Sequence, residues 1–423
     1  MKDQILGASN SPEKLEALYR SDSSGFERSF PDVFEECPES LLLQAWHQRL
    51  LFERHSAKDE AVVSRGNWGR KDFYVIFGLI FISGTLLKLP YFISTIDAEL
   101  FYSRNFGGIV AGALMGFFCF QRQVQPKVIM VISSLLILSL LYLNLLPDPS
   151  NSDTSALACL HLSFAFWFLI GVSFVGGTWK DLSERMHFVR YNGELLIFGT
   201  VITIGGMVLT GLTIGLFELI GLSIGEWYMN SVGVYGAVSV PLVATFLITR
   251  IVNGRFRMAP LLAKVFTPLF LVMVLLYLTA MAVKRQSPFS DRDFLMAFNG
   301  LLVVVLGLCV FSISERGTKE SVGAFDLMNI GLVSVTLLID LVALAAIVFR
   351  LSSYGITPNR VAVLGANLLA FCHLAGILFF YIQFIRRKGS SRGLEDWIVR
   401  FLPVYTLWSL IVAVVLPLVF QFS

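Results

Sequence analysis

Two charged side chains, Lys88 and Asp340, lie deep within apolar stretches of this 423-residue chain. Lys88 is about fifteen residues into the stretch 73–93, or ~22 Å along a helix, and Asp340 is about thirteen residues into 327–349, or ~20 Å. A charge at membrane depth is costly and needs a partner or water. Because both stretches are expected to run outward, we predict that the two charges pair or line one water-filled cavity. The alternative is that Lys88 extends to the outer headgroups and Asp340 bonds a neighbouring helix.

Three uncharged polar residues occupy comparable positions. Asn299 and Asn367 fall in the outer halves of their stretches, and His373 lies near the middle of the second. Hydrogen bonding between helices is the usual role of such side chains. A polar cavity that opens outward would also explain why they gather in the outer half, and Pro90 is expected to break the helix that carries Lys88.

Two outer connections hold further candidates for binding a ligand. In the second of them, Gly355 permits a positive φ and Thr357 is expected to cap the helix that follows. Arg360 then lies at the outer interface, where it either supports the helix start or binds an anion or lipid headgroup. The candidates in the two connections are Arg104, Asn105, Tyr354, Gly355, Thr357 and Arg360.

The elements that position these residues are expected to be membrane-spanning helices. Hydrophobic residues make up 55% of the chain and its mean hydropathy is +0.71, values far from those of a soluble domain. A span needs ~20 mostly apolar residues. The stretches of that kind are 73–93, 106–120, 128–146, 156–176, 195–220, 228–248, 265–283, 294–313, 327–349, 361–385 and 398–420. The second is short and is either a span with little tilt or a re-entrant segment.

Basic residues predict the orientation of these eleven spans. Lys and Arg number 20 on the connections that would be cytoplasmic and 6 on the others. This bias places the N-terminus in the cytoplasm and the C-terminus outside. The predicted fold is therefore an all-α, polytopic helix bundle over residues 72–423. The net charge of +3 follows from this topology and gives no reason to expect nucleic-acid binding.

Residues 1–71 are predicted to form a small helical segment in the cytoplasm. Ser11 followed by Pro12 indicates a helix start, and a second helix is expected over 39–54. So short a segment rarely holds a core alone, so we expect it to dock on the membrane domain or on a partner. His47 is interpreted as a surface or packing residue.

The sequence contains no motif for catalysis, a cofactor or a metal in the spacing and structural context that such a site requires. The five cysteines are scattered and form no CxxC pair. The GxSxG string at 221–225 lies in a short connection between helices rather than on a strand–turn–helix elbow. Glycines spaced by four at 108, 112 and 116, and at 211 and 215, predict close helix packing.

Three stretches resemble a family of bacterial membrane proteins, the domain of unknown function 4153 family. They are Lys88-Leu89-Pro90 with the residues up to Asn105, the run from Arg350 to Arg360, and an N-terminal pattern that includes Leu15, Leu18, Tyr19 and Trp46. The resemblance implies a multi-pass protein of the bacterial cytoplasmic (inner) membrane. It implies no activity, cofactor or substrate.

Three functions remain open from the sequence. The first is transport or handling of an unknown small molecule through an outward-facing polar cavity around Lys88 and Asp340. The second is a sensor or assembly subunit whose N-terminal helices or outer loops bind a cytoplasmic or envelope protein. The third and weakest is an intramembrane enzyme acting on lipids, because paired acid and base residues at a cavity mouth are lacking.

Overall fold

The computed structural model describes residues 1–37, 39–50, 70–219, 221–249, 258–284, 292–314, 322–386 and 390–422. It divides the chain into two compact units, Met1–Asn67 and Trp68–Ser423. The described residues form helices and the connections between them and contain no strand, which confirms the all-α prediction.

The first unit is a cluster of short helices around its own apolar core. Its helices are α1 (Lys2–Gly7), α2 (Pro12–Ser21), α3 (Ser23–Glu36) and a further helical stretch over 41–50. Leu15, Phe26 and Leu43 are fully buried between them. A core is thus present in a segment that was expected to be too short to hold one.

The start of α2 and the environment of His47 are the two local features of this unit that the sequence predicted. Pro12 does open α2, but the Ser11 hydroxyl makes no capping hydrogen bond. His47 stacks on Phe34 with ring centroids 4.4 Å apart, which agrees with its interpretation as a packing residue. Residues 51–54 of the expected second helix lie outside the described residues.

The second unit consists of long helices, and every apolar stretch expected from the sequence overlaps one of them. They are α5 (Arg70–Leu87), α6 (Leu89–Phe92), α7 (Ala98–Gln121), α8 (Pro126–Leu145), α9 (Asp153–Phe174), α10 (Leu182–Leu219), α11 (Gly225–Tyr228), the π-helix η1 (Met229–Gly233), α12 (Val234–Leu247), α13 (Met258–Lys284), α14 (Arg292–Ser314), α15 (Ala324–Tyr354), α16 (Pro358–Ile385), α17 (Ser391–Leu410), the π-helix η3 (Ile411–Val415) and α18 (Leu416–Val419).

Seven helices among the described residues are long and apolar enough to cross a bilayer, so the chain is a multi-pass membrane protein by helix length and composition. Three further apolar helices, over 73–87, 262–276 and 298–314, are shorter. The expected short second span lies within α7, a continuous helix of 24 residues. The count of eleven spans and the orientation stay predictions.

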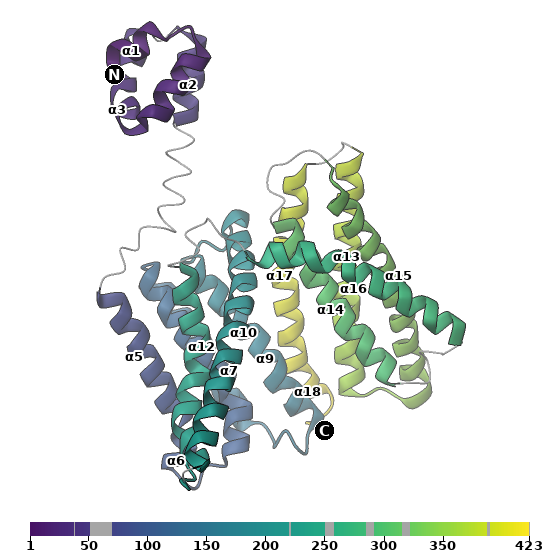
Figure 1. Ribbon diagram of the computed structural model, residues 1–423. Coiled ribbons are helices and arrows are strands. Elements are labelled where there is room, and N and C mark those ends of the chain that lie inside the picture. The colour runs from purple at the N-terminus through teal and green to yellow at the C-terminus, as the bar shows by residue number, and fades with distance from the viewer. Residues whose placement is uncertain are drawn as a thin grey trace. The chain divides into compact units, whose positions relative to one another are not determined.

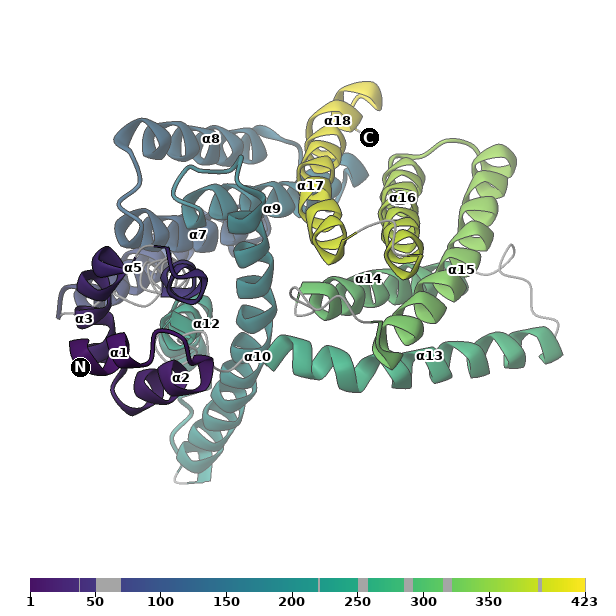
Figure 2. The ribbon, with the colours of Figure 1, turned by 90° about the horizontal axis from the view of Figure 1, so that it is seen from above.

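The helices of this second unit form two groups, as Figures 1 and 2 show. Helices α5, α7, α8, α9 and α12 lie on one side, and α13 to α16 lie on the other. Helices α10 and α17 lie between the groups and contact members of both. Each group has its own cluster of buried apolar residues.

Glycines let some of these helices approach closely, though not all those expected. Gly108 and Gly112 of α7 lie against Leu140 and Leu136 of α8, as the spacing predicts. At Gly211 and Gly215 of α10, an added Cβ would have no neighbouring atom within 4 Å among the described residues. The expectation of close packing at that second pair is wrong, because this part of α10 is exposed along its length.

Helices α16 and α17 are joined by two tryptophans that cover glycines. Trp408 lies over Gly365, where an added Cβ would be 1.9 Å from the ring, and Trp397 lies over Gly376, where it would be 2.1 Å away. Any larger residue at either glycine must displace an indole ring. The two contacts therefore fix the register of α17 on α16.

We expect Gly376→Ala to lower the thermal unfolding midpoint of the purified protein, because its methyl group overlaps the Trp397 ring and overpacking costs about 1–3 kcal/mol. Gly307→Ala in α14 is the matched control, since Gly307 has no atom within 4 Å of an added Cβ. That control should be neutral or slightly stabilising, as alanine favours helix. Equal midpoints for the two variants would contradict the close contact.

Candidate functional site

Asp340 is the most exceptional polar residue of the second unit. It lies in α15, and its side chain is 2% exposed. Neither carboxylate oxygen has a hydrogen-bond partner within the described part of the chain. Taking a carboxylate out of water costs several kcal/mol unless a partner compensates it. Asp340 is therefore either neutral or compensated by something other than the described residues.

The position of Asp340 along the helices follows from a polar contact about three turns away. Asn329 of α15 donates from Nδ2 to the Ser312 hydroxyl of α14 (2.7 Å) and to the Tyr381 hydroxyl of α16 (3.2 Å). Asp340 is eleven residues further along α15. Helices α14 and α16 run antiparallel to α15, so eleven residues forward along α15 correspond to eleven residues backward along each of them. Counting back from Ser312 and Tyr381 gives positions 301 and 370, which lie at the level of Asp340.

A pair of amides lies within a turn of that level. Asn367 of α16 donates from Nδ2 to Oδ1 of Asn299 in α14 at 2.9 Å, and Asn367 is 3% exposed. Asn299 is two residues from 301 and Asn367 three residues from 370, a difference of less than ~5 Å along a helix. The structure thus brings together Asp340, Asn299 and Asn367, three of the sequence candidates, at one depth.

The buried face of α15 carries a further polar residue that sequence analysis missed. Thr336 lies one turn before Asp340 on the same face, is 1% exposed, and its Oγ1 has no partner among the described residues. The spacing of 329, 336 and 340 by seven and four residues is the signal that was available. We call the set comprising Asn299, Ser312, Asn329, Thr336, Asp340, Asn367 and Tyr381 the polar seam.

A positive side chain near the polar seam does not neutralise Asp340. Arg350 is half-buried, and its Nη1 has no acceptor among the described residues. It follows Asp340 by ten residues, which corresponds to ~15 Å along α15. At that separation the two side chains make no direct bond.

The expected pair of Lys88 with Asp340 is wrong. Lys88 lies between α5 and α6, and its Nζ donates to the Ser231 hydroxyl of η1 at 3.3 Å. It also lies over the Tyr91 ring, 4.8 Å from the centroid. Helices α5 and α15 are on opposite sides of the second unit in both views (Figures 1 and 2). Counting residues along each apolar stretch gives the depth of a side chain along the membrane normal. It does not tell which helices are neighbours in the bundle.

His373 belongs to a different contact from the polar seam. Its ring stacks on Phe401 of α17 with centroids 4.5 Å apart, and its Nδ1 is 2.9 Å from the Tyr405 hydroxyl. Six residues separate His373 from Asn367, which places the two on different faces of α16. The histidine therefore packs between α16 and α17, as the interhelical interpretation predicts.

Arg104 and Asn105 bind the end of a neighbouring helix. Arg104 is 8% exposed, and its Nη2 donates to the carbonyl oxygens of Leu146 (2.7 Å) and Pro147 (2.9 Å), just beyond the last turn of α8. Asn105 and Asn144 exchange two amide hydrogen bonds. Cations at helix C-termini satisfy unpaired carbonyl groups and interact favourably with the helix dipole. This geometry is that of a structural cap.

The connection between α15 and α16 uses the same arrangement. Arg360 donates from Nη1 to the carbonyl oxygens of Tyr354 (2.9 Å) and Gly355 (2.6 Å) at the end of α15. Gly355 has φ +82°, and the Thr357 hydroxyl accepts from the Arg360 amide at 3.4 Å. The expected turn and cap are present, and the guanidinium is engaged by the chain itself.

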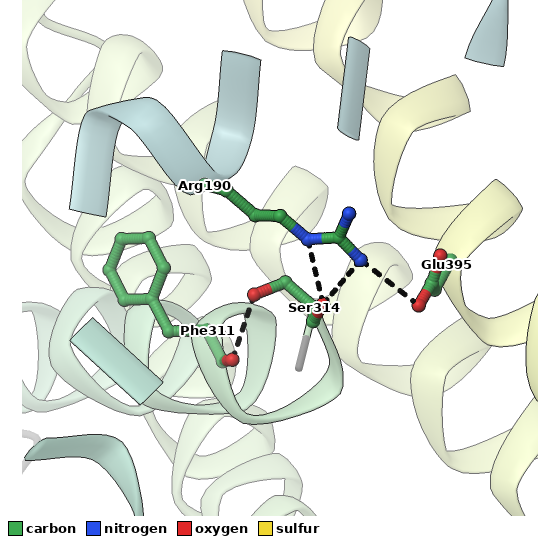
Figure 3. Close-up of polar contacts among 4 residues, drawn as sticks. All are labelled: Arg190, Phe311, Ser314 and Glu395. Atoms are coloured by element: carbon green, nitrogen blue, oxygen red, sulfur yellow. Dashed lines mark hydrogen bonds and ion pairs between the residues drawn. The ribbon is translucent and has the colours of Figure 1, made fainter. Parts of the chain in front are cut away.

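Arg190 repeats this contact at the end of α14, a role that the sequence did not reveal. Its Nε donates to the carbonyl oxygen of Ser314, the last residue of α14, at 2.8 Å. Its Nη2 also lies 3.4 Å from Glu395 of α17 (Figure 3). Arg190 thereby connects α10 with α14 and α17. Its sequence position, among basic residues attributed to topology, gave no separate signal.

A cavity of about 560 Å³ is separate from the polar seam. It is a shallow groove along α10, lined by Asn192, Leu195, Leu196, Gly199, Thr200, Thr203, Ile204 and Met207. Its lining has no charged side chain, and much of the surrounding helix surface is apolar and exposed. This groove therefore differs from the polar cavity expected around Lys88 and Asp340.

We expect Arg104→Ala to lower the unfolding midpoint, because two to three carbonyl groups lose a charged donor and a hydrogen bond to a charged group contributes about 1.5–3 kcal/mol. The midpoint of the detergent-solubilised protein measures this. Arg392→Ala, which removes an exposed arginine from α17, is the control and should change little. A normal midpoint for Arg104→Ala would exclude a structural role for this cap.

Comparisons with protein-family models, with curated proteins and with solved structures each found no match to this chain. The resemblance noted from the sequence therefore gains no support from them, and the chain's own geometry is the basis on which a function can be proposed.

Proposed function

We propose that this membrane protein binds and moves a small solute at the polar seam, with Asp340 as the residue that the solute contacts. The observation that carries this proposal is the isolation of the Asp340 carboxylate: it is 2% exposed and has no donor among the described residues. Uncompensated ionisable groups at membrane depth are rare and usually serve a substrate or ion pathway.

The contrast within the polar seam supports a ligand for Asp340 in particular. Asn299, Asn329 and Asn367 have partners on neighbouring helices, so they hold the helices together. Asp340 makes no such bond within the described part of the chain, and its uncompensated charge lowers stability. Residues that lower stability and make no stabilising contact are typical of functional sites.

The location also agrees with transport. The contacts of Asn329 and of the amide pair bracket Asp340 along α15, which places the carboxylate well inside the helix rather than near either end. Solute and ion sites of transporters lie near the middle of the membrane, between helices that can change their packing. Three helices meet here, α14, α15 and α16, and each contacts the other two.

We expect Asp340→Asn to abolish the response to a bound solute and to leave stability equal or higher, because the amide keeps the shape and removes an uncompensated charge. Thermal unfolding of the purified protein is measured with a panel of small amines, guanidines, amino acids and sugars. A solute that stabilises the wild type is then tested for counterflow in proteoliposomes.

The matched control for that experiment is Glu99→Gln, which neutralises an exposed carboxylate in the first turn of α7. It should respond to solute as the wild type does. If Asp340→Asn retained full stabilisation and counterflow, Asp340 would not be the contact residue and the proposal would fail.

A second candidate function is attachment of a protein partner by the first unit. The observation that favours it is the separate core of residues 1–50, in which Leu15, Phe26 and Leu43 are fully buried. A unit with its own core is typical of a docking module that works beside a membrane domain.

We expect deletion of residues 1–67 to leave the unfolding midpoint and the solute response of the second unit unchanged, because the two units are compact by themselves. Growth of cells that depend on the protein should fail if a partner is essential. Loss of membrane expression on deletion would show instead that the first unit is needed for folding.

A further inference from the structure

The unpaired buried atoms of the polar seam on α15 share one chemistry, which is that of an oxygen acceptor. They are Oδ1 of Asn329, Oγ1 of Thr336 and both carboxylate oxygens of Asp340. Each of the three residues is at most 2% exposed. A hydroxyl can also donate, but the amide oxygen and the oxygens of an ionised carboxylate only accept. Asn329 is eleven residues from Asp340, or ~16 Å along α15, so only the oxygen atoms of Thr336 and Asp340 can share one site. Oxygen atoms gathered away from water are suited to hard cations.

The positions of Thr336 and Asp340 make them neighbours. Four residues separate them, so their side chains lie on one face of α15 and one turn apart, with Cβ atoms about 5–6 Å from each other. An ion between them would receive the hydroxyl oxygen and one or both carboxylate oxygens. Asn299 and Asn367 lie within a turn of the same level, where the amide oxygen of Asn299 already accepts a hydrogen bond from Asn367.

The charge of the site limits the ion to a single positive charge. Asp340 is the acid at this level of α15, and the next acid on the helix, Asp326, lies fourteen residues away, or ~21 Å. Asp326 is also engaged at the start of the helix, where it accepts from the Gly323 amide. One carboxylate balances a monovalent cation and leaves a divalent cation half compensated.

We propose that Asp340 and Thr336 bind a monovalent alkali cation within the polar seam, as the ion that accompanies or constitutes the solute. This inference rests on the proposed function and adds the identity of the ligand class. A proton would occupy only one carboxylate oxygen, whereas an alkali ion engages several oxygen atoms at once, which is what the pairing of Thr336 with Asp340 offers.

The test is thermal unfolding of the full chain in nanodiscs, titrated with sodium chloride against choline chloride at constant ionic strength, at one acidic and one alkaline pH. We expect sodium to raise the unfolding midpoint of the wild type and to leave the midpoint of Asp340→Asn unchanged. Thr336→Val keeps the charge and the shape but removes the hydroxyl, so about tenfold more sodium should be required for the same effect. Thr336→Ser should restore the wild-type response.

Thr267→Val is the matched control. Thr267 of α13 is also buried, at 1% exposed, and its hydroxyl also has no partner among the described residues. Its helix packs on the opposite face of α15, because Leu271 contacts Gly331, nine residues before Asp340. Thr267→Val should therefore respond to sodium as the wild type does.

Two results would overturn the inference. One is a wild-type midpoint that responds to pH but not to sodium, lithium or potassium, which would assign the site to a proton. The other is an unchanged sodium response in Thr336→Val. In either case a solute response that depends on Asp340 would leave the proposed function in place, so the two failures are distinguishable.

Discussion

Carbonyl groups at the end of a helix have no partner within that helix, and this second unit depends on arginines that supply one. Arg104 binds the end of α8, Arg190 the end of α14 and Arg360 the end of α15. In an apolar medium such unpaired groups would cost several kcal/mol each. Each guanidinium reaches more than one acceptor, so it holds the helix end in a defined position. The helices can therefore end sharply at connections as short as Gly355–Thr357.

With the ends of α14 and α15 held, these two helices and α16 keep a register in which polar side chains meet at two levels. Asn329 meets Ser312 and Tyr381, and Asn299 meets Asn367. Between those two levels lies Asp340, for which no described residue supplies a donor. The hydrogen-bonded amides specify how the helices pack. No packing contact explains why residue 340 is an aspartate.

The helices themselves were predictable because apolar length is a strong signal, and each expected stretch overlaps a helix. Asp340, Asn299 and Asn367 were recognised as candidates for the same reason: polar residues in apolar runs are conspicuous. Their grouping was not predictable, since depth along the membrane says nothing about which helices are neighbours. For that reason Lys88 was assigned to Asp340 and in fact bonds Ser231. Thr336 was missed because a threonine hydroxyl commonly bonds its own helix, and nothing in the sequence distinguishes one that does not.

The tryptophan contacts between α16 and α17 constrain the length of two segments together. Eleven residues separate Gly365 from Gly376, and eleven separate Trp397 from Trp408. Eleven residues make close to three whole turns, so both glycines face α17 and both indoles face α16. One residue inserted between the two glycines, or between the two tryptophans, would rotate one member of the pair by about 100° around its helix. One indole ring would then no longer lie over a glycine and would meet the neighbouring helix instead. Insertions and deletions in these two stretches are therefore tolerable only when they occur in both, which ties the evolution of one helix to that of the other.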